Sequence, residues 1–234
     1  MTLTHATDNQ ICDSSYDSRN TWNGLSDFGK KVVREMNKIG MMIDVSHCTD
    51  KTFYDILKIT NKPLVATHSS PRKFTPNFER NMSDNMIKDL ANNNGLIMLN
   101  FGSGFISEQS NKSLGDINSK VEKYKIENNL EDSDKKLLKY KDDLINSVKP
   151  FASINDFIDT IDYVKELVGI DHIGLGSDFE GLGNTLPYDL KDASTYPNIL
   201  YNLLEREYSE IEIKKICSDN LFRVWNANLQ NRQI

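Results

Sequence analysis

The chain has 234 residues, of which 38% are hydrophobic and 26% are charged, and its formal net charge is −6. This length and composition suit one globular domain, 1–234, with a sizeable core. The negative balance argues against a nucleic-acid surface, and no apolar run approaches the roughly 20 residues of a membrane span.

The first predicted elements are a strand, a helix and a second strand. Residues 1–5 (MTLTH) alternate like a strand interior and end at His5, so we expect an earlier part of the fold to be missing from this sequence. Ser26 is a typical N-cap for a helix that runs to Gly40. The apolar run 41–46 follows, as in a buried parallel strand, and it ends at His47.

The same order of helix and strand repeats along the next sixty residues. Thr49 can cap a helix over 50–59, and the strand 64–67 after it ends at His68. Ser83 can cap the following helix, which leads into a strand over 96–101.

Residues 106–150 differ in character, because they are rich in charge and poor in apolar positions. We interpret them as a surface helical insertion within the single domain. The alternation then resumes with a helix whose apolar face runs from Phe157 to Leu167, and with a strand over 172–177 that ends at Asp178. Two C-terminal helices follow, around YPNILYNLLERE and SEIEIKKICSDNLFRVW.

Five strands separated by helices predict a parallel sheet and an α/β fold, since parallel neighbours need helical crossovers. A complete (β/α)8 TIM-type barrel has eight strands and takes about 250 residues. Five strands fall short of that number. The prediction is therefore an incomplete barrel, made of about the last five strands and carrying the helical insertion.

Four side chains that can bind a metal ion or transfer a proton each follow the last apolar residue of a predicted strand: His5, His47, His68 and Asp178. The carboxyl ends of parallel strands meet on one face, where ligands bind. Each histidine taken singly could equally be a hydrogen-bonded structural residue. Together they indicate a metal or acid–base site, and imidazole with carboxylate suits zinc.

Other polar residues near these strands have more ordinary interpretations. His172 begins its strand and is expected to be structural, and Cys48 is more typical of packing than of metal binding. Asp44 is a candidate buried partner that could orient His47. The glycines of GLGSDFEGLG match no phosphate-binding motif, so we expect them to allow tight turning around Asp178.

The chain resembles the membrane (renal) dipeptidase family, metallopeptidases of the amidohydrolase type. The resemblance lies in these segments: TLTH, GLSDFGKKVVREMNKIGMMIDVSHCTDKTFYDIL, KPLVATHSSPR, RN, LVGIDHIGLGSDFEG, YPNILYNLLERE and NLFRV. It implies a (β/α)8 barrel with two zinc ions as cofactors. It also implies a dipeptide substrate, hydrolysis of the peptide bond by a zinc-activated water, and homodimers in some members.

The resemblance also implies a role for each matching residue. His47 and His68 look like the two histidine ligands of one zinc, and Asp178 looks like the catalytic carboxylate that binds the other zinc and carries the proton. His5 resembles the catalytic, substrate-facing histidine that polarises the scissile carbonyl. Arg80 resembles the residue that pairs with the C-terminal carboxylate of the substrate, which suits a planar guanidinium.

The family also uses a His-x-Asp pair and a bridging Glu before its LTH segment, and this sequence supplies neither. We therefore expect the chain to be inactive alone and to need the N-terminal part of the barrel or a partner chain. The alternatives are a non-catalytic truncated remnant, one subunit of a split dipeptidase, or another hydrolase of this barrel type. Three unpaired, widely spaced cysteines and no visible secretory signal predict a cytoplasmic location.

Overall fold

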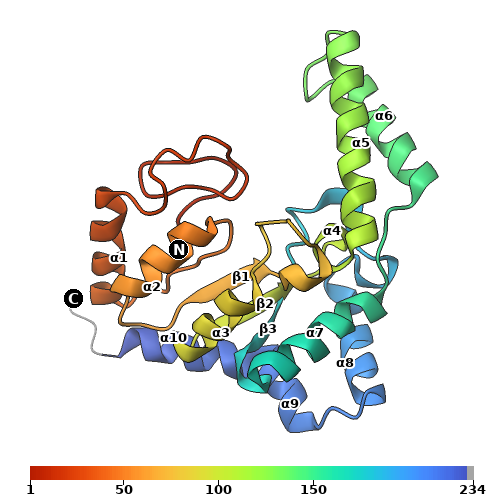
Figure 1. Cartoon of the computed structure of the whole chain (residues 1–234). Helices are drawn as coiled ribbons and strands as arrows, with labels where there is room; N and C mark the ends of the chain where they lie inside the picture. Colours follow the sequence, from red (N-terminus) through yellow and green to blue (C-terminus); the bar gives the residue numbers. More distant parts are fainter. Residues whose placement is uncertain (231–234) are drawn as a thin grey trace.

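The computed structural model describes residues 1–230, and its centre is a three-stranded parallel sheet in the order β1–β2–β3 (Figure 1). The strands are β1 (Val65–Ser69), β2 (Leu96–Asn100) and β3 (Ile173–Gly176). Helices connect the strands, as parallel pairing requires. The predicted α/β class is confirmed, and the incomplete barrel stays a prediction.

Two of the five predicted strands, 1–5 and 41–46, are not strands in the structure. They nevertheless lie beside β1, since single parallel bridges join Thr2 to Asp44 and Asp44 to Val65. The prediction of five regular strands was therefore wrong, although both segments run parallel to the sheet at its edge.

The ladder between 41–46 and β1 is interrupted because side chains replace backbone acceptors. The N–H of Thr67 donates to the Asp44 carboxylate at 3.0 Å, and the N–H of His68 donates to Ser46 Oγ at 3.1 Å. Such local bonds compete with regular sheet pairing. They occur at the carboxyl end of β1, where the candidate site lies.

Helices cover the sheet and connect its strands. Their bounds are α1 (Asp27–Ile39), α2 (Asp50–Ile59), α3 (Asp84–Asn92), α4 (Ser103–Ile106), α5 (Glu108–Glu127), α6 (Lys135–Val148), α7 (Ile154–Val168), α8 (Tyr196–Glu205), α9 (Glu210–Lys214) and α10 (Asn220–Leu229). The predicted N-caps Ser26, Thr49 and Ser83 each accept a backbone N–H of the first turn. Among residues 1–230, no helix combines the length and the apolar character needed to cross a membrane.

Helices α5 and α6 project from the rest of the molecule and form what we call the helical arm (Figure 1). Their contact is a narrow apolar seam with Ile117, Leu137 and Ile145 buried. The rings of Tyr124 and Tyr140 stack across it at 4.1 Å between centroids. The arm therefore has a small core of its own, although most of its side chains are charged or polar.

Helix α10 packs across the amino ends of the strands, away from the predicted site. The guanidinium of Arg223 donates to the carbonyl of Asn94 at 2.7 Å, and the amide of Asn228 donates to the carbonyl of Pro63 at 3.0 Å. These carbonyls precede β2 and β1. Helix α10 therefore does not cover the carboxyl ends of the strands, where the loops carry the candidate site residues.

Candidate functional site

The carboxyl ends of the strands carry the candidate residues on one face of the sheet. His68 lies near the end of β1, Asp178 follows β3 by two residues, and His47 follows the segment 41–46. His47 and Asp178 both have positive φ, at 70° and 55°. Non-glycine residues rarely adopt this conformation, and it is enriched at functional sites.

Three imidazole rings gather at this face. The Nε2 atoms of His47 and His68 are 2.9 Å apart. The ring of His5 lies against His47 with 4.2 Å between centroids, and the rings of His47 and His68 are 4.9 Å apart. The three histidines, which are separated by up to 63 positions in the chain, therefore form one cluster.

The histidines of the pair are held in their neutral form. Burial lowers the pKa of His47 to about 2, and the positive charge of Arg80 adds to the effect. Burial and Arg80 also lower the pKa of His68, while the carboxylates of Asp178 and Asp44 act in the opposite direction. Neutral imidazole is the form that binds metal ions.

The geometry of the pair approaches that of one side of a zinc site. Two Zn–N bonds of about 2.0–2.1 Å at a tetrahedral angle place the nitrogens about 3.3–3.4 Å apart, whereas the Nε2 atoms lie 2.9 Å apart, at hydrogen-bond distance, so a bound zinc would require the two rings to separate by about 0.4 Å. Within residues 1–230, however, no three side chains among His, Cys, Asp and Glu are grouped so that they could hold a metal ion. Within these residues the histidine pair could supply at most two ligands of a metal ion.

Asp44 acts on His68 rather than on His47, so the expected partnership with His47 was wrong. The hydroxyl of Thr67 lies 2.6 Å from Asp44 Oδ2 and 2.7 Å from Nδ1 of His68. A carboxylate only accepts, so Thr67 donates its single proton to Asp44 and accepts from the Nδ1–H of His68. This tautomer leaves Nε2 of His68 with a free lone pair that faces His47.

Asp178 is oriented by Asn100, the last residue of β2. The amide of Asn100 donates to Asp178 Oδ2 at 3.0 Å, and its own oxygen accepts the N–H of Gly102 at 2.7 Å. A Cβ at Gly181 would lie 2.3 Å from Asp178 Oδ1, so a larger residue there would displace the Asp178 carboxylate. This confirms the interpretation of the glycines around Asp178, whereas the sequence analysis missed Asn100.

Arg80 is a buried cation beside the histidines, with only 3% of its surface exposed. Its two terminal nitrogens donate to Ser69 Oγ and to the carbonyl of His68, each at 2.8 Å. Its Nε is buried with no hydrogen-bond partner, and none of the ion pairs in residues 1–230 includes it. Burying a charge without a counter-ion is unfavourable, so the site favours an anionic ligand.

Aromatic side chains form the wall next to the histidines and Arg80. Tyr16 lies 5.7 Å from His47 and 6.3 Å from Phe78 between ring centroids, and Phe105 lies 5.4 Å below the guanidinium of Arg80. Sequence reasoning missed Tyr16, because it lies in an irregular loop without a periodic pattern. Cys48 is buried in the core, as expected for packing.

We expect the metal-free chain to lose stability as the pH falls from 7 to 5, more steeply than a His47→Gln variant. The folded chain lowers the pKa of His47 from 6.5 to about 2. Below pH 6.5 the unfolded chain therefore binds a proton that the folded chain does not, and the stability that neutral His47 contributes falls progressively toward pH 2. The difference in slope is at most about 1.4 kcal/mol per pH unit.

Urea unfolding midpoints in EDTA at pH 7, 6 and 5 measure this difference. Because carboxylates titrate mostly below this range, the comparison with His47→Gln isolates the histidine. Equal slopes in the two proteins would contradict the burial of a neutral His47.

Known proteins share this chain's sequence pattern and fold. The model of the family described as membrane dipeptidase (peptidase family M19) matches residues 1–233. Dipeptidase tcpJ of Claviceps purpurea is 32% identical over 224 residues, covering 96% of this chain and 43% of that protein. An uncharacterized dipeptidase of Schizosaccharomyces pombe is 31% identical over 227 residues, covering 97% of this chain and 46% of that protein.

Solved structures agree with this similarity. The probable dipeptidase PvdM from Pseudomonas aeruginosa superposes with a TM-score of 0.80 at 25% identity, covering 98% of this chain and 62% of that one. A Rhodobacter sphaeroides metallopeptidase was crystallised with a phosphinate mimic of the dipeptide L-Ala-D-Ala. It superposes with a TM-score of 0.67 at 25% identity, covering 88% of this chain and 47% of that one. The chain spans less than half the length of the two dipeptidases matched by sequence.

Proposed function

This chain belongs to the membrane dipeptidase family, peptidase family M19, and from that premise we propose that it carries part of the active site of a zinc-dependent dipeptidase. The observation that supports this most strongly is a pair of neutral imidazoles beside a buried guanidinium that forms no ion pair within residues 1–230. Metal ligands and an anion-binding group on one face suit hydrolysis of a short peptide with a free carboxylate.

His47 and His68 would hold one zinc through their Nε2 atoms, and Asp178 would contribute to a second. Zinc, when bound, supplies the Lewis acidity that makes a water molecule nucleophilic near neutral pH. The Asp44–Thr67 chain keeps Nε2 of His68 unprotonated, which is the state that a ligand needs. Asp178, held by Asn100, would take a proton from the attacking water and pass it to the leaving amine.

Two cationic or polar groups would bind the substrate. Arg80 would pair with the C-terminal carboxylate, because it is a buried guanidinium whose Nε–H has no hydrogen-bond partner in residues 1–230. His5, exposed beside His47, would donate a hydrogen bond to the scissile carbonyl and stabilise the oxyanion that develops.

We propose further that other metal ligands come from outside these 234 residues. Catalytic zinc sites usually have three protein ligands, and in residues 1–230 the histidine pair has no third. A partner chain or a further segment of a longer protein could supply it. The same observation keeps a second candidate function open, that of a non-catalytic remnant or one subunit of a split enzyme.

The test is hydrolysis of unblocked dipeptides, such as L-Ala-D-Ala, in the presence of zinc. We expect little turnover from the chain alone, and turnover once it is co-produced with the part of the S. pombe dipeptidase that the match does not cover. Bound zinc, measured by mass spectrometry, should rise in the same preparation. Full turnover with two zinc ions in the chain alone would contradict the need for outside ligands. No turnover in either preparation would favour the non-catalytic alternative.

A further inference from the structure

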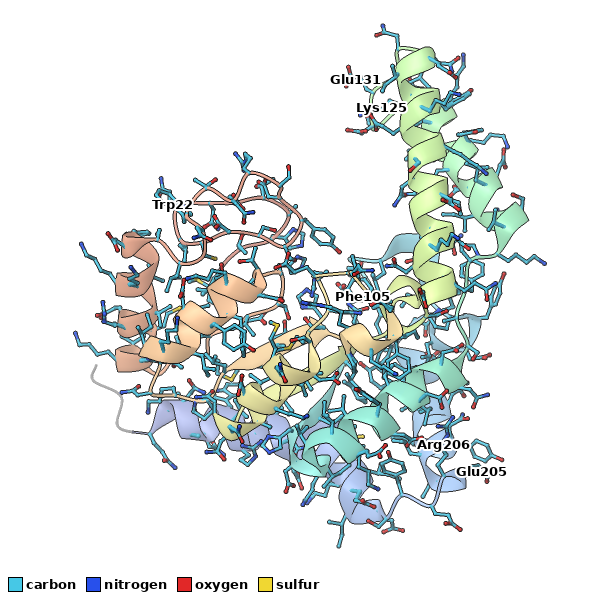
Figure 2. The ribbon with its side chains drawn as sticks, viewed as in Figure 1. Trp22, Phe105, Lys125, Glu131, Glu205 and Arg206 are labelled. Atoms are coloured by element: carbon cyan, nitrogen blue, oxygen red, sulfur yellow. The ribbon has the colours of Figure 1, made fainter. Side chains whose placement is uncertain are left out.

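A cavity of about 360 Å³ lies where the helical arm meets the carboxyl face of the sheet. Its lining comes from three parts of the chain: the loops that carry Tyr16 and Phe78, the helices α4 to α6, and the loop after Asp178. Figure 2 shows Phe105, which belongs to this lining, at the foot of the helical arm. Its volume falls within the range of about 300–1,000 Å³ that is common for small-molecule sites.

The cavity adjoins the candidate site through shared side chains. The ring of Phe105 lines it and lies 5.4 Å from the guanidinium of Arg80. Tyr16 lines it and contacts His47 through its ring. Gly181 also lines it and lies directly against the carboxylate of Asp178. A molecule held by Arg80 could therefore extend a side chain past Phe105 into this space.

The lining is suited to an apolar group. Aromatic rings and branched aliphatic side chains make up half of it, including Tyr16, Phe78, Phe105, Ile117 and Leu182, and the other half is glycine and polar residues. None of the residues that line it is acidic, and Lys141 on the exposed surface of α6 is the single cation among them. Aromatic rings pack well against such walls in edge-to-face or offset contacts.

We propose that this cavity receives the side chain of the C-terminal residue of the dipeptide, and that it favours bulky apolar side chains, aromatic ones above all. The inference rests on the proposed function, since the carboxylate bound by Arg80 defines which residue of the substrate lies nearest. The helical arm would then help to determine which dipeptides the enzyme prefers.

Gly115 of α5 offers a way to fill the cavity without disturbing its walls. It lines the cavity, and a Cβ at this position would meet no atom within 4 Å. A phenylalanine there has room to occupy the cavity, whereas an alanine is too small to fill it. Both replace a glycine in a helix, so both favour the helix.

The experiment compares the binding of Gly-Phe and Gly-Gly to the metal-free chain by titration calorimetry. We expect Gly-Phe to bind about tenfold or more tightly, the usual discrimination by an apolar pocket. The ratio should fall to near one in Gly115→Phe and persist in Gly115→Ala. Lys120→Phe, on the same helix but outside the cavity, should also keep the ratio. Circular dichroism and thermal melting check that each variant is folded.

The outcomes separate this inference from the proposed function. Equal binding of the two dipeptides, no binding of either, a preference for Gly-Glu over Gly-Phe, or an unchanged ratio in Gly115→Phe would each overturn the pocket. Turnover of dipeptides by the co-produced enzyme without any side-chain preference would overturn the pocket and leave the function standing. A binding preference that depends on Gly115, together with no turnover by the co-produced, zinc-loaded enzyme, would support the pocket and count against the function.

Discussion

Replacing Asp178 by asparagine is expected to lower kcat for dipeptide hydrolysis by about 10²–10⁴-fold, the usual contribution of a positioned general base. Asparagine has the same shape but cannot take up a proton at neutral pH. Its amide oxygen can still accept the hydrogen bond that Asn100 donates at 3.0 Å. Asparagine also tolerates the positive φ of this position, at 55°, better than most residues.

The measurement is steady-state kinetics on the co-produced, zinc-loaded enzyme, with thermal melting to show that the variant is folded. Glu180→Gln is the matched control, because Glu180 is an exposed carboxylate two residues away. We expect the control to keep the kcat of the wild type. A loss of less than about threefold in Asp178→Asn would show that another group carries the proton.

Replacing Asp44 by leucine is expected to lower the free energy of unfolding by about 3–5 kcal/mol. The Asp44 carboxylate is 2% exposed and accepts four hydrogen bonds, two from the hydroxyls of Thr2 and Thr67 and two from the backbone N–H groups of Ser46 and Thr67. Leucine would leave all four donors without this acceptor. Each buried donor left without a hydrogen bond costs about 1–3 kcal/mol, unless water or a rotated side chain supplies a new partner.

Urea unfolding of the metal-free chain at pH 7 measures this loss. Asp44→Asn is the informative companion, because it keeps one oxygen acceptor and nearly the same volume. It should therefore cost clearly less than leucine. A loss of less than about 1 kcal/mol in Asp44→Leu would mean that the segments 1–5 and 41–46 are held to β1 mainly by their backbone bridges and apolar contacts.

The two variants separate two tasks that carboxylates perform at this face. Asp178 lies at the open end of the sheet and is held by a single side-chain bond, so its replacement should change chemistry more than stability. Asp44 lies inside and joins adjacent segments of the sheet. Through Thr67 it also selects the tautomer of His68, so its replacement should weaken zinc binding as well as stability.

The sequence by itself was sufficient for the helix starts and for three of the five predicted strands. The N-caps Ser26, Thr49 and Ser83 begin helices as expected, since capping depends on residues within one turn. The order of helices and strands followed from hydrophobic periodicity, and with it the α/β class. The placement of His47, His68 and Asp178 on one face followed as well, because parallel strands all end on the same side of a sheet.

Only the tertiary structure decided which atoms meet. The bond between Asn100 and Asp178 joins residues 78 positions apart, and the link from Asp44 to Thr67 spans 23. Both depend on the register of neighbouring strands and on the exact end of each one. Residue pattern carries no information on register at this precision, so Asp44 was assigned to the wrong histidine.

The cavity under the helical arm was likewise beyond the sequence. Residues 106–150 have sparse apolar positions, which predicted a solvated surface insertion. The few apolar residues at its foot, such as Ile117 and Ile145, gain their role only where the arm meets Tyr16 and Leu182 from distant loops. Periodicity identifies which face of a helix is apolar, whereas packing between elements far apart in the chain determines whether that face closes a core or lines a binding site.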